Sequence, residues 1–262
     1  MKRTEDSTSE YRKRIWAELA TVARPDSRFH WDFSSFIADF KGSEECARRI
    51  LSLDSYRVGG AVFITPDNST EALRATVIAD ERPVLMTTYG IGRGFLLLGA
   101  GSVPSGQEPY AATLDGMDRL ARPVTLGEIA SGERLRLLVT GGSAVSANGI
   151  RFGKGHGYFD LEWAMLSEIG AVDAATEIVC VVHDCQVVDE PLTGADHDVA
   201  VDWIITPTRS IHVTAPGRKL GQVRWEMLEH SPLAQIPPIR ELQAGIRTPR
   251  PQTRLPMCSD ST

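Results

Sequence analysis

The sequence has few cysteines and no long apolar run. Its four cysteines (Cys46, Cys180, Cys185 and Cys258) form no C-x-x-C pair, and isolated thiols of this kind are typical of a reducing compartment. No apolar stretch approaches the ~20 residues that cross a bilayer. Residues 1–10 are polar and lack the apolar middle of a secretion signal. We therefore expect a cytoplasmic protein that does not enter a membrane.

An excess of positive charge is also missing. The 34 acidic residues outnumber the 28 basic ones, and no basic patch marks the body of the chain, so a nucleic-acid partner is not expected. The densest basic run lies among prolines near the C-terminus and is predicted to be a solvated tail. We predict one α/β domain over residues 9–215, a helical appendage over 216–244 and a disordered tail over 245–262.

The hydrophobic period alternates along the chain between that of strands and that of helices. Apolar positions at helical spacing predict a helix over residues 9–23 and another over 42–53 with Ser43 as its cap. Strand, helix and strand then follow one another, which is typical of a parallel sheet with helices on both faces. Further strands are predicted at 60–66, 83–87, 94–99, 135–140, 177–182 and 199–206, and further helices at 67–79 and 161–169.

A glycine-rich segment over residues 149–160 carries the densest functional signal. Gly153, Gly155 and Gly157 allow tight turns that present several backbone N–H groups to one anion. Lys154 and Arg151 add positive charge, and the start of the following helix adds its dipole. These features predict a polyphosphate cradle; a glycine-rich surface turn is the alternative.

Two details bear on this hypothesis. Only five of the 28 basic residues are lysines, so a lysine inside the loop favours a compact point charge on phosphate. The segment is neither a P-loop, because no Ser or Thr follows Lys154, nor a dinucleotide fingerprint, because a long connection separates it from the preceding strand. No G-x-S-x-G elbow is present either, and Cys180 reads as a core residue.

The second cluster of candidate residues is acidic. Asp184, Asp189 and Asp196 lie in polar stretches, and we expect solvated loops there. Asp202 instead interrupts the apolar run over residues 199–205, where an ionised carboxylate is costly without a metal or a donor. We therefore expect a functional role for Asp202, with Mg²⁺ as the candidate ion.

The glycine-rich segment resembles the signature of the 5-formyltetrahydrofolate cyclo-ligase family, G-x-R-[LF]-G-x-G-x-G-[YF]-[YF]-D. A cyclo-ligase-like paralogue branch is more similar still. Its G-K-G-x-G-[YF]-x-D-L-E, H-D-x-Q-V-V and H-D-x-x-V-D-x-I-x-T-P-T match residues 153–162, 183–188 and 197–208. The resemblance spans about residues 11–215. It implies a doubly wound α/β fold with a mostly parallel sheet flanked by helices, like that of sugar-phosphate isomerases and CoA-transferases.

The resemblance also implies ATP and Mg²⁺ as cofactors. In the family's reaction, ATP phosphorylates the formyl oxygen on N5 of 5-formyltetrahydrofolate; N10 then attacks, phosphate leaves and the 5,10-methenyl ring closes. Lys154, Arg151 and Tyr158 are the implied catalytic residues, and Asp160 and Asp202 the implied metal ligands. The implied ATP-binding residues are Arg12, Lys13, Arg14, Arg151, Gly153, Lys154, Gly155, His156, Gly157 and Tyr158.

Two departures from the family pattern leave the substrate open. Trp16 stands where the family has a second N-terminal basic residue, and the glutamates that contact folate have no clear equivalent in residues 36–42. Three functions therefore remain: a folate cyclo-ligase, a paralogue that acts on another heterocycle such as a thiamine-related compound, and a nucleotide-binding regulatory protein without turnover. Each has small molecules as its partners.

Overall fold

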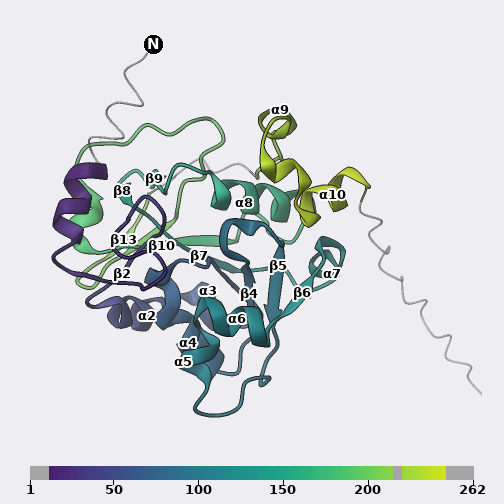
Figure 1. Ribbon diagram of the computed structural model, residues 1–262, viewed down its shortest axis with the longest axis horizontal. Coiled ribbons are helices and arrows are strands. Elements are labelled where there is room, and N and C mark those ends of the chain that lie inside the picture. The colour runs from purple at the N-terminus through teal and green to yellow at the C-terminus, as the bar shows by residue number, and fades with distance from the viewer. Residues whose placement is uncertain (1–11, 215–219, 246–262) are drawn as a thin grey trace, which may run out of the picture.

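The computed structural model describes residues 12–214 and 220–245, so all but the first residue of the predicted tail lies outside the described residues. Its centre is an eight-stranded sheet in the order β13-β12-β10-β7-β3-β4-β5-β6 (Figure 1). The five strands from β12 to β4 are parallel, and the outer strands β13, β5 and β6 are antiparallel. The strands are β3 (Val62–Ile64), β4 (Val84–Thr87), β5 (Phe95–Leu98), β6 (Arg122–Val124), β7 (Leu137–Gly141), β10 (Glu177–Val181), β12 (Trp203–Ile205) and β13 (Ser210–His212).

Helices cover both faces of this sheet, as the sequence predicted (Figure 1). One face carries α2 (Ser43–Leu51), α4 (Glu71–Ala79), α5 (Glu108–Ala111) and α6 (Leu114–Leu120), with α3 (Asp54–Arg57) beside α2. The opposite face carries α8 (Tyr158–Glu168), α7 (Leu126–Ala130), α9 (Trp225–Leu228) and α10 (Pro237–Gln243). The predicted doubly wound, mostly parallel α/β class is therefore confirmed.

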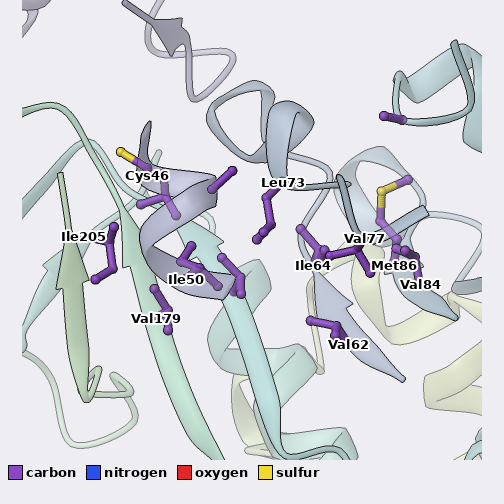
Figure 2. Close-up of a cluster of buried hydrophobic side chains, with 14 of the residues drawn as sticks. Cys46, Ile50, Val62, Ile64, Leu73, Val77, Val84, Met86, Val179 and Ile205 are labelled. Carbon is purple, nitrogen blue, oxygen red and sulfur yellow. The ribbon is translucent and has the colours of Figure 1, made fainter. Parts of the chain in front are cut away.

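The period of two along each strand explains the two hydrophobic layers. In β3, Val62 and Ile64 face one layer while Phe63 faces the other, because successive side chains of a strand point to opposite faces. Figure 2 shows the first layer, in which Ile50 of α2 and Leu73 and Val77 of α4 pack over the strands. Because both faces are covered, the central strands are buried along their length, and this explains their continuous apolar runs.

Most predicted elements are present, but the predicted starts of three helices are wrong. Helix α8 begins at Tyr158 and not at residue 161. Residues 12–19 are helical in the described part of the N-terminal helix. Helix α2 is capped by Gly42 in a left-handed conformation (φ 93°), and Ser43 is its first, buried residue. The segment after β3 first forms the 3₁₀ turn η1 (Asn68–Thr70) before α4. Asp67 makes no side-chain capping bond to it.

Several short elements carried no periodic signal in the sequence. A small sheet in the order β11-β8-β9 contains β8 (Ala144–Ser146), β9 (Arg151–Phe152) and β11 (Val187–Val188). A two-stranded sheet pairs β1 (Ala23–Arg24) with β2 (Asp39–Phe40). The remaining 3₁₀ segments are η2 (Tyr89–Ile91), η3 (Asp184–Gln186) and η4 (Pro232–Gln235), the last lying between α9 and α10. No helix in the described parts of the chain is long and apolar enough to cross a membrane.

The strand order contains one switch point. From β3 the chain continues to β4 on one side, and it later returns to place β7 on the other side of β3. The carboxyl ends of parallel strands lie at one edge of a sheet, and ligands of open α/β folds bind outside that edge, at the point where the strand order reverses. The fold therefore places a crevice between the ends of β3 and β7.

Candidate functional site

The glycine loop, residues 153–157, lies directly before α8, as the sequence predicted, and it follows β9, which the sequence did not predict. Gly155 (φ 97°) and Gly157 (φ 65°) are left-handed, a backbone conformation that glycine adopts without strain. Gly157 precedes the first residue of α8 and provides no side-chain cap. The first N–H groups of this 11-residue helix are therefore open to an anion, and the helix dipole favours one there.

A cavity of about 250 Å³ lies under this loop. Its wall includes the whole loop together with Thr65, Thr87 and Thr140, which stand at the carboxyl ends of β3, β4 and β7. The cavity therefore opens at the switch point of the sheet. The glycine loop and the sheet edge, whose residues are far apart in the sequence, therefore line the same cavity.

Basic side chains from two segments reach this cavity. Arg12, from the N-terminal helix, lines the cavity, and its guanidinium lies 5.8 Å from the ring centroid of Phe152. Burial lowers the pKa of Arg12. Its Nε has no hydrogen-bond partner in the described part of the chain. A half-buried cation with an unpaired donor favours an anionic ligand.

Lys154 lies between two aromatic rings at the mouth of the cavity. Its Nζ is 4.5 Å from the ring centroid of Tyr89 and 5.8 Å from that of Tyr158. These cation–π contacts hold the ammonium group over the loop without neutralising its charge. His156 stacks on Tyr158, with ring centroids 5.1 Å apart and planes at 3°, so the loop side chains form one ordered group.

Arg151 is buried beneath the loop with 8% of its surface exposed. Its guanidinium stacks on Phe159 at 4.6 Å, and its Nη2 lies 3.4 Å from Oδ1 of Asp160. Asp160 also accepts a hydrogen bond from the N–H of Val199 at 2.9 Å. Asp160 therefore ties the loop and α8 to the segment that precedes β12, and Arg151 keeps its Nε unpaired beside the cavity.

Three predicted residues lie outside this constellation. Lys13 and Arg14 are exposed on the N-terminal helix and do not line the cavity. Asp202 stands just before β12 rather than within it, at the amino end of the parallel strands. There its Oδ2 accepts a hydrogen bond from the N–H of Ile178 at 2.7 Å. The structure does not bring Asp202 to the loop, because that residue opens its strand and the cavity lies where strands end.

Glu162 is a cavity residue that the sequence reasoning missed. It is 2% exposed and lines the cavity from the second turn of α8. Thr87 donates a hydrogen bond to its Oε1 at 2.6 Å, whereas Oε2 has no partner among the described residues. Burial raises the pKa of Glu162 to about 8. Its signal was an acidic residue inside the otherwise apolar run over residues 161–166.

Asp67 is the second missed residue. Its Oδ2 accepts hydrogen bonds from Thr65 Oγ1 at 2.6 Å and from the N–H of Gly141 at 2.9 Å, so it joins the ends of β3 and β7. A side chain at Gly141 would collide with its neighbours, since a Cβ there would lie 2.6 Å from the hydroxyl oxygen of Ser69. An aspartate directly after a buried strand was the available signal, but the sequence predicted residue 67 only as the start of a helix.

The motif at residues 183–188 has a structural role. Gln186 is buried; its Nε2 donates to the carbonyls of Gly142 and Ser143, and its Oε1 accepts from the N–H of His183 at 2.7 Å. Asp184 accepts hydrogen bonds from Thr206, Thr208 and Arg209. The expectation of a solvated loop is wrong for Asp184, but Asp189 and Asp196 are exposed as expected, and Cys180 is a core residue with 0% exposure.

Comparison with known proteins decides the family. The family model described as the 5-formyltetrahydrofolate cyclo-ligase family matches residues 4–207. The chain belongs to this family. The expected family is thereby confirmed, together with the likeness to its paralogue branch.

Curated relatives are named methenyltetrahydrofolate synthase domain-containing protein. The human protein is 34% identical over 249 residues, which cover 91% of this chain and 63% of the relative. The mouse protein is also 34% identical, over 242 residues, which cover 90% of this chain and 63% of the mouse protein. The chain thus spans less than two thirds of the length of these relatives. Among solved structures, a 5,10-methenyltetrahydrofolate synthetase of Aquifex aeolicus aligns with a TM-score of 0.49 at 18% identity, over 82% of this chain and 97% of that one.

The residues around the glycine loop are suited to bind a polyphosphate. Three cations line the cavity, and two of them keep an unpaired Nε beside it. The helix start and the glycines supply backbone donors as well. In the described ranges, no three residues among His, Cys, Asp and Glu gather as a metal site.

Proposed function

We propose that this chain is an ATP-dependent, cyclo-ligase-type enzyme that converts 5-formyltetrahydrofolate to 5,10-methenyltetrahydrofolate. The observation that carries the proposal is the glycine loop at the start of α8, which opens on a cavity lined by Arg12, Arg151 and Lys154. Membership of the cyclo-ligase family supports the reaction class.

In this proposal the loop binds the polyphosphate. The first N–H groups of α8 and the amides of residues 153–157 donate to phosphate oxygens, as in other helix-terminus sites. Lys154 supplies a point charge at the transferred group, where negative charge is stabilised during phosphoryl transfer. Arg12 and Arg151 donate from the two sides of the cavity, and Tyr158 positions Lys154 through its ring.

Mg²⁺ would accompany the nucleotide. The ion prefers phosphate oxygens and water, with only one or two protein carboxylates, so the polyphosphate itself supplies most of its ligands. Its role would be to neutralise charge on the transferred phosphoryl group. We assign it no pair of protein ligands, because Asp202 lies apart from the loop and Asp160 is engaged by Arg151 and Val199.

One observation favours a second candidate, an enzyme of the same type with a different heterocyclic substrate. Within the 36–42 segment, where folate-contacting glutamates are missing, the residue that lines the cavity is Ile37. Asp39 in the same segment pairs with Arg24 at 2.9 Å instead. An apolar side chain at this wall supports a substrate that needs no carboxylate there.

A single assay separates these candidates. The protein is incubated with Mg-ATP and 5-formyltetrahydrofolate while the absorbance of the methenyl product is followed and ADP is measured. Methenyl formation coupled to ADP release is the expected result. ATP binding without methenyl formation would instead support the other-substrate enzyme, and ATP binding without ADP release on any heterocycle tested would support a regulatory protein.

A further inference from the structure

The cavity wall contains a carboxyl group that is almost fully buried and forms no salt bridge with a described residue. Glu162 is 2% exposed, and no described Lys, Arg or His nitrogen lies within salt-bridge distance of it. The nearest charged groups are Asp67 after β3, Arg151 on β9 and Asp160 on its own helix. Arg151 is engaged by Asp160, and Asp67 is itself negative. An ionised carboxylate would therefore be buried beside two other acids with only Arg151, which Asp160 already engages, as a counter-charge, and this is costly.

The one hydrogen bond of Glu162 to a described residue engages only one of its two carboxyl oxygens. Thr87, at the end of β4, donates to Oε1 at 2.6 Å, so this oxygen acts as the acceptor. Oε2 is buried and has no partner in the described part of the chain. In a neutral carboxyl group whose Oε1 already accepts, Oε2 carries the proton and is a donor without an acceptor.

The other unpaired polar atoms of residues that line the cavity are also hydrogen-bond donors. Arg12 Nε and Arg151 Nε are both buried donors without partners among the described residues, and both side chains line the cavity with Glu162. Three unpaired donors around one hollow are complementary to a ligand with several acceptor oxygens, since buried donors are normally satisfied. A phosphoryl group presents such oxygens, whereas a cationic ligand would leave all three donors unpaired.

We propose that Glu162 is a neutral carboxylic acid that donates its Oε2–H hydrogen bond to a phosphoryl oxygen of the bound nucleotide. The inference rests on the proposed ATP binding and adds a specificity-determining residue to it. Glu162 would therefore donate a hydrogen bond to the ligand, although the residue is an acid. A neutral carboxyl donor can pair with a phosphoryl oxygen, whereas an ionised carboxylate at the same place would repel it.

Two substitutions separate a donor from a charged carboxylate. Glu162→Gln keeps an N–H donor at nearly the same place, whereas Glu162→Leu removes it. Calorimetry with ATP at pH 7 is expected to show about a tenfold loss of affinity for Glu162→Leu, the value of one hydrogen bond. Glu162→Gln should recover most of that loss. Glu168→Gln, on the exposed end of the same helix, is the matched control and should bind as the parent does.

A second measurement does not depend on nucleotide or on the folding of the leucine variant. The infrared spectrum of the parent at pH 7 should contain a protonated-carboxyl C=O band that is missing in Glu162→Gln and present in Glu168→Gln. Absence of this band from the parent would overturn the inference. So would ATP binding by the parent with equal losses in Glu162→Gln and Glu162→Leu. A parent that binds no ATP would overturn the proposed function, and this contact with it.

Discussion

The glycine loop and the segment over residues 183–209 both carry motifs of the cyclo-ligase-like branch, yet their polar groups are used in opposite ways. In the segment over 183–209, Asp184 takes three side-chain donors and Gln186 binds the backbone on both sides. Around the loop, buried atoms of Arg12, Arg151 and Glu162 have no partner among the described residues. Membership of the same family motifs does not reveal this difference.

The difference follows from what each region stabilises. Buried polar groups that are fully paired contribute to the fold, whereas buried donors left unpaired cost free energy unless a ligand satisfies them. Gln186 joins the segment after β10 to the turn after β7, and Asp184 joins the same segment to the turn after β12. The 183–209 segment therefore holds the sheet edge in place, and in the proposed function the loop binds ATP at that edge.

The largest expected effect is a loss of stability when the hydrogen-bonded segment over residues 183–209 is changed. Gln186→Leu should lower the free energy of unfolding by about 4 kcal/mol, because it leaves the carbonyls of Gly142 and Ser143 and the N–H of His183 without their partner, at about 1–3 kcal/mol each. Urea denaturation measures this loss, and ATP affinity of the folded fraction should fall less than threefold. The exposed Gln235→Leu is the control. A loss below about 1 kcal/mol would contradict the structural role of Gln186.

The next effect tests the unpaired side through pH. The folded pKa of Glu162 is raised to about 8, so the folded state keeps a proton that the unfolded state loses near pH 4.3. The stability associated with this group is present below that pH and is lost as pH rises toward 8. Between pH 5 and 8 the parent should lose about 3 kcal/mol more than Glu162→Gln. Parallel stability curves for the two proteins would show that Glu162 is ionised in the folded state.

The sequence predicted the strands and the position of the glycine loop better than it predicted which polar residues meet at the cavity. Strands such as β3, β7 and β10 were predictable because both their faces are buried, so their residues are almost all apolar. The position of the glycine loop before α8 was predictable because glycines and a helix start are both local signals. These features need no knowledge of contacts between distant residues.

The rest depends on which ends of strands meet. Asp202 and Asp67 are both acidic residues beside a buried strand, but Asp67 follows β3 and lies at the cavity, whereas Asp202 precedes β12 and lies at the opposite end. Strand boundaries are the least certain part of a sequence-based assignment. A shift of a few residues, which placed Asp202 inside its strand, was enough to misplace the expected metal ligand.

A third prediction concerns charge at the loop. Lys154→Ala should weaken ATP binding by about 2 kcal/mol, or roughly 30-fold, since a charge-assisted contact to phosphate contributes about 1.5–3 kcal/mol. Its effect on unfolding should stay within about 0.5 kcal/mol, because at the cavity mouth the side chain contacts two aromatic rings and donates one hydrogen bond, at 3.4 Å, to the Tyr89 hydroxyl. The exposed Lys41→Ala is the matched lysine control. Equal nucleotide affinity in the Lys154→Ala variant and the parent would remove the loop from the proposed site.

The smallest effect concerns Asp184 at low pH. Burial by itself raises the pKa of this carboxyl group, but hydrogen bonds from Thr208, Thr206 and Arg209 outweigh it and hold the pKa below its usual value. The stability from a lowered pKa is present above the unfolded value near 3.9 and is lost as pH falls through the folded pKa.

Asp184→Asn cannot titrate, so between pH 5 and pH 3 it should lose about 1 kcal/mol less stability than the parent. Thermal unfolding at a series of pH values measures the difference, and the exposed Asp189→Asn should follow the parent. ATP affinity at pH 7 should be unchanged in both variants, because neither residue lines the cavity. If Asp184→Asn instead weakens nucleotide binding as Lys154→Ala does, the division between a paired, structural region and an unpaired, binding region does not hold.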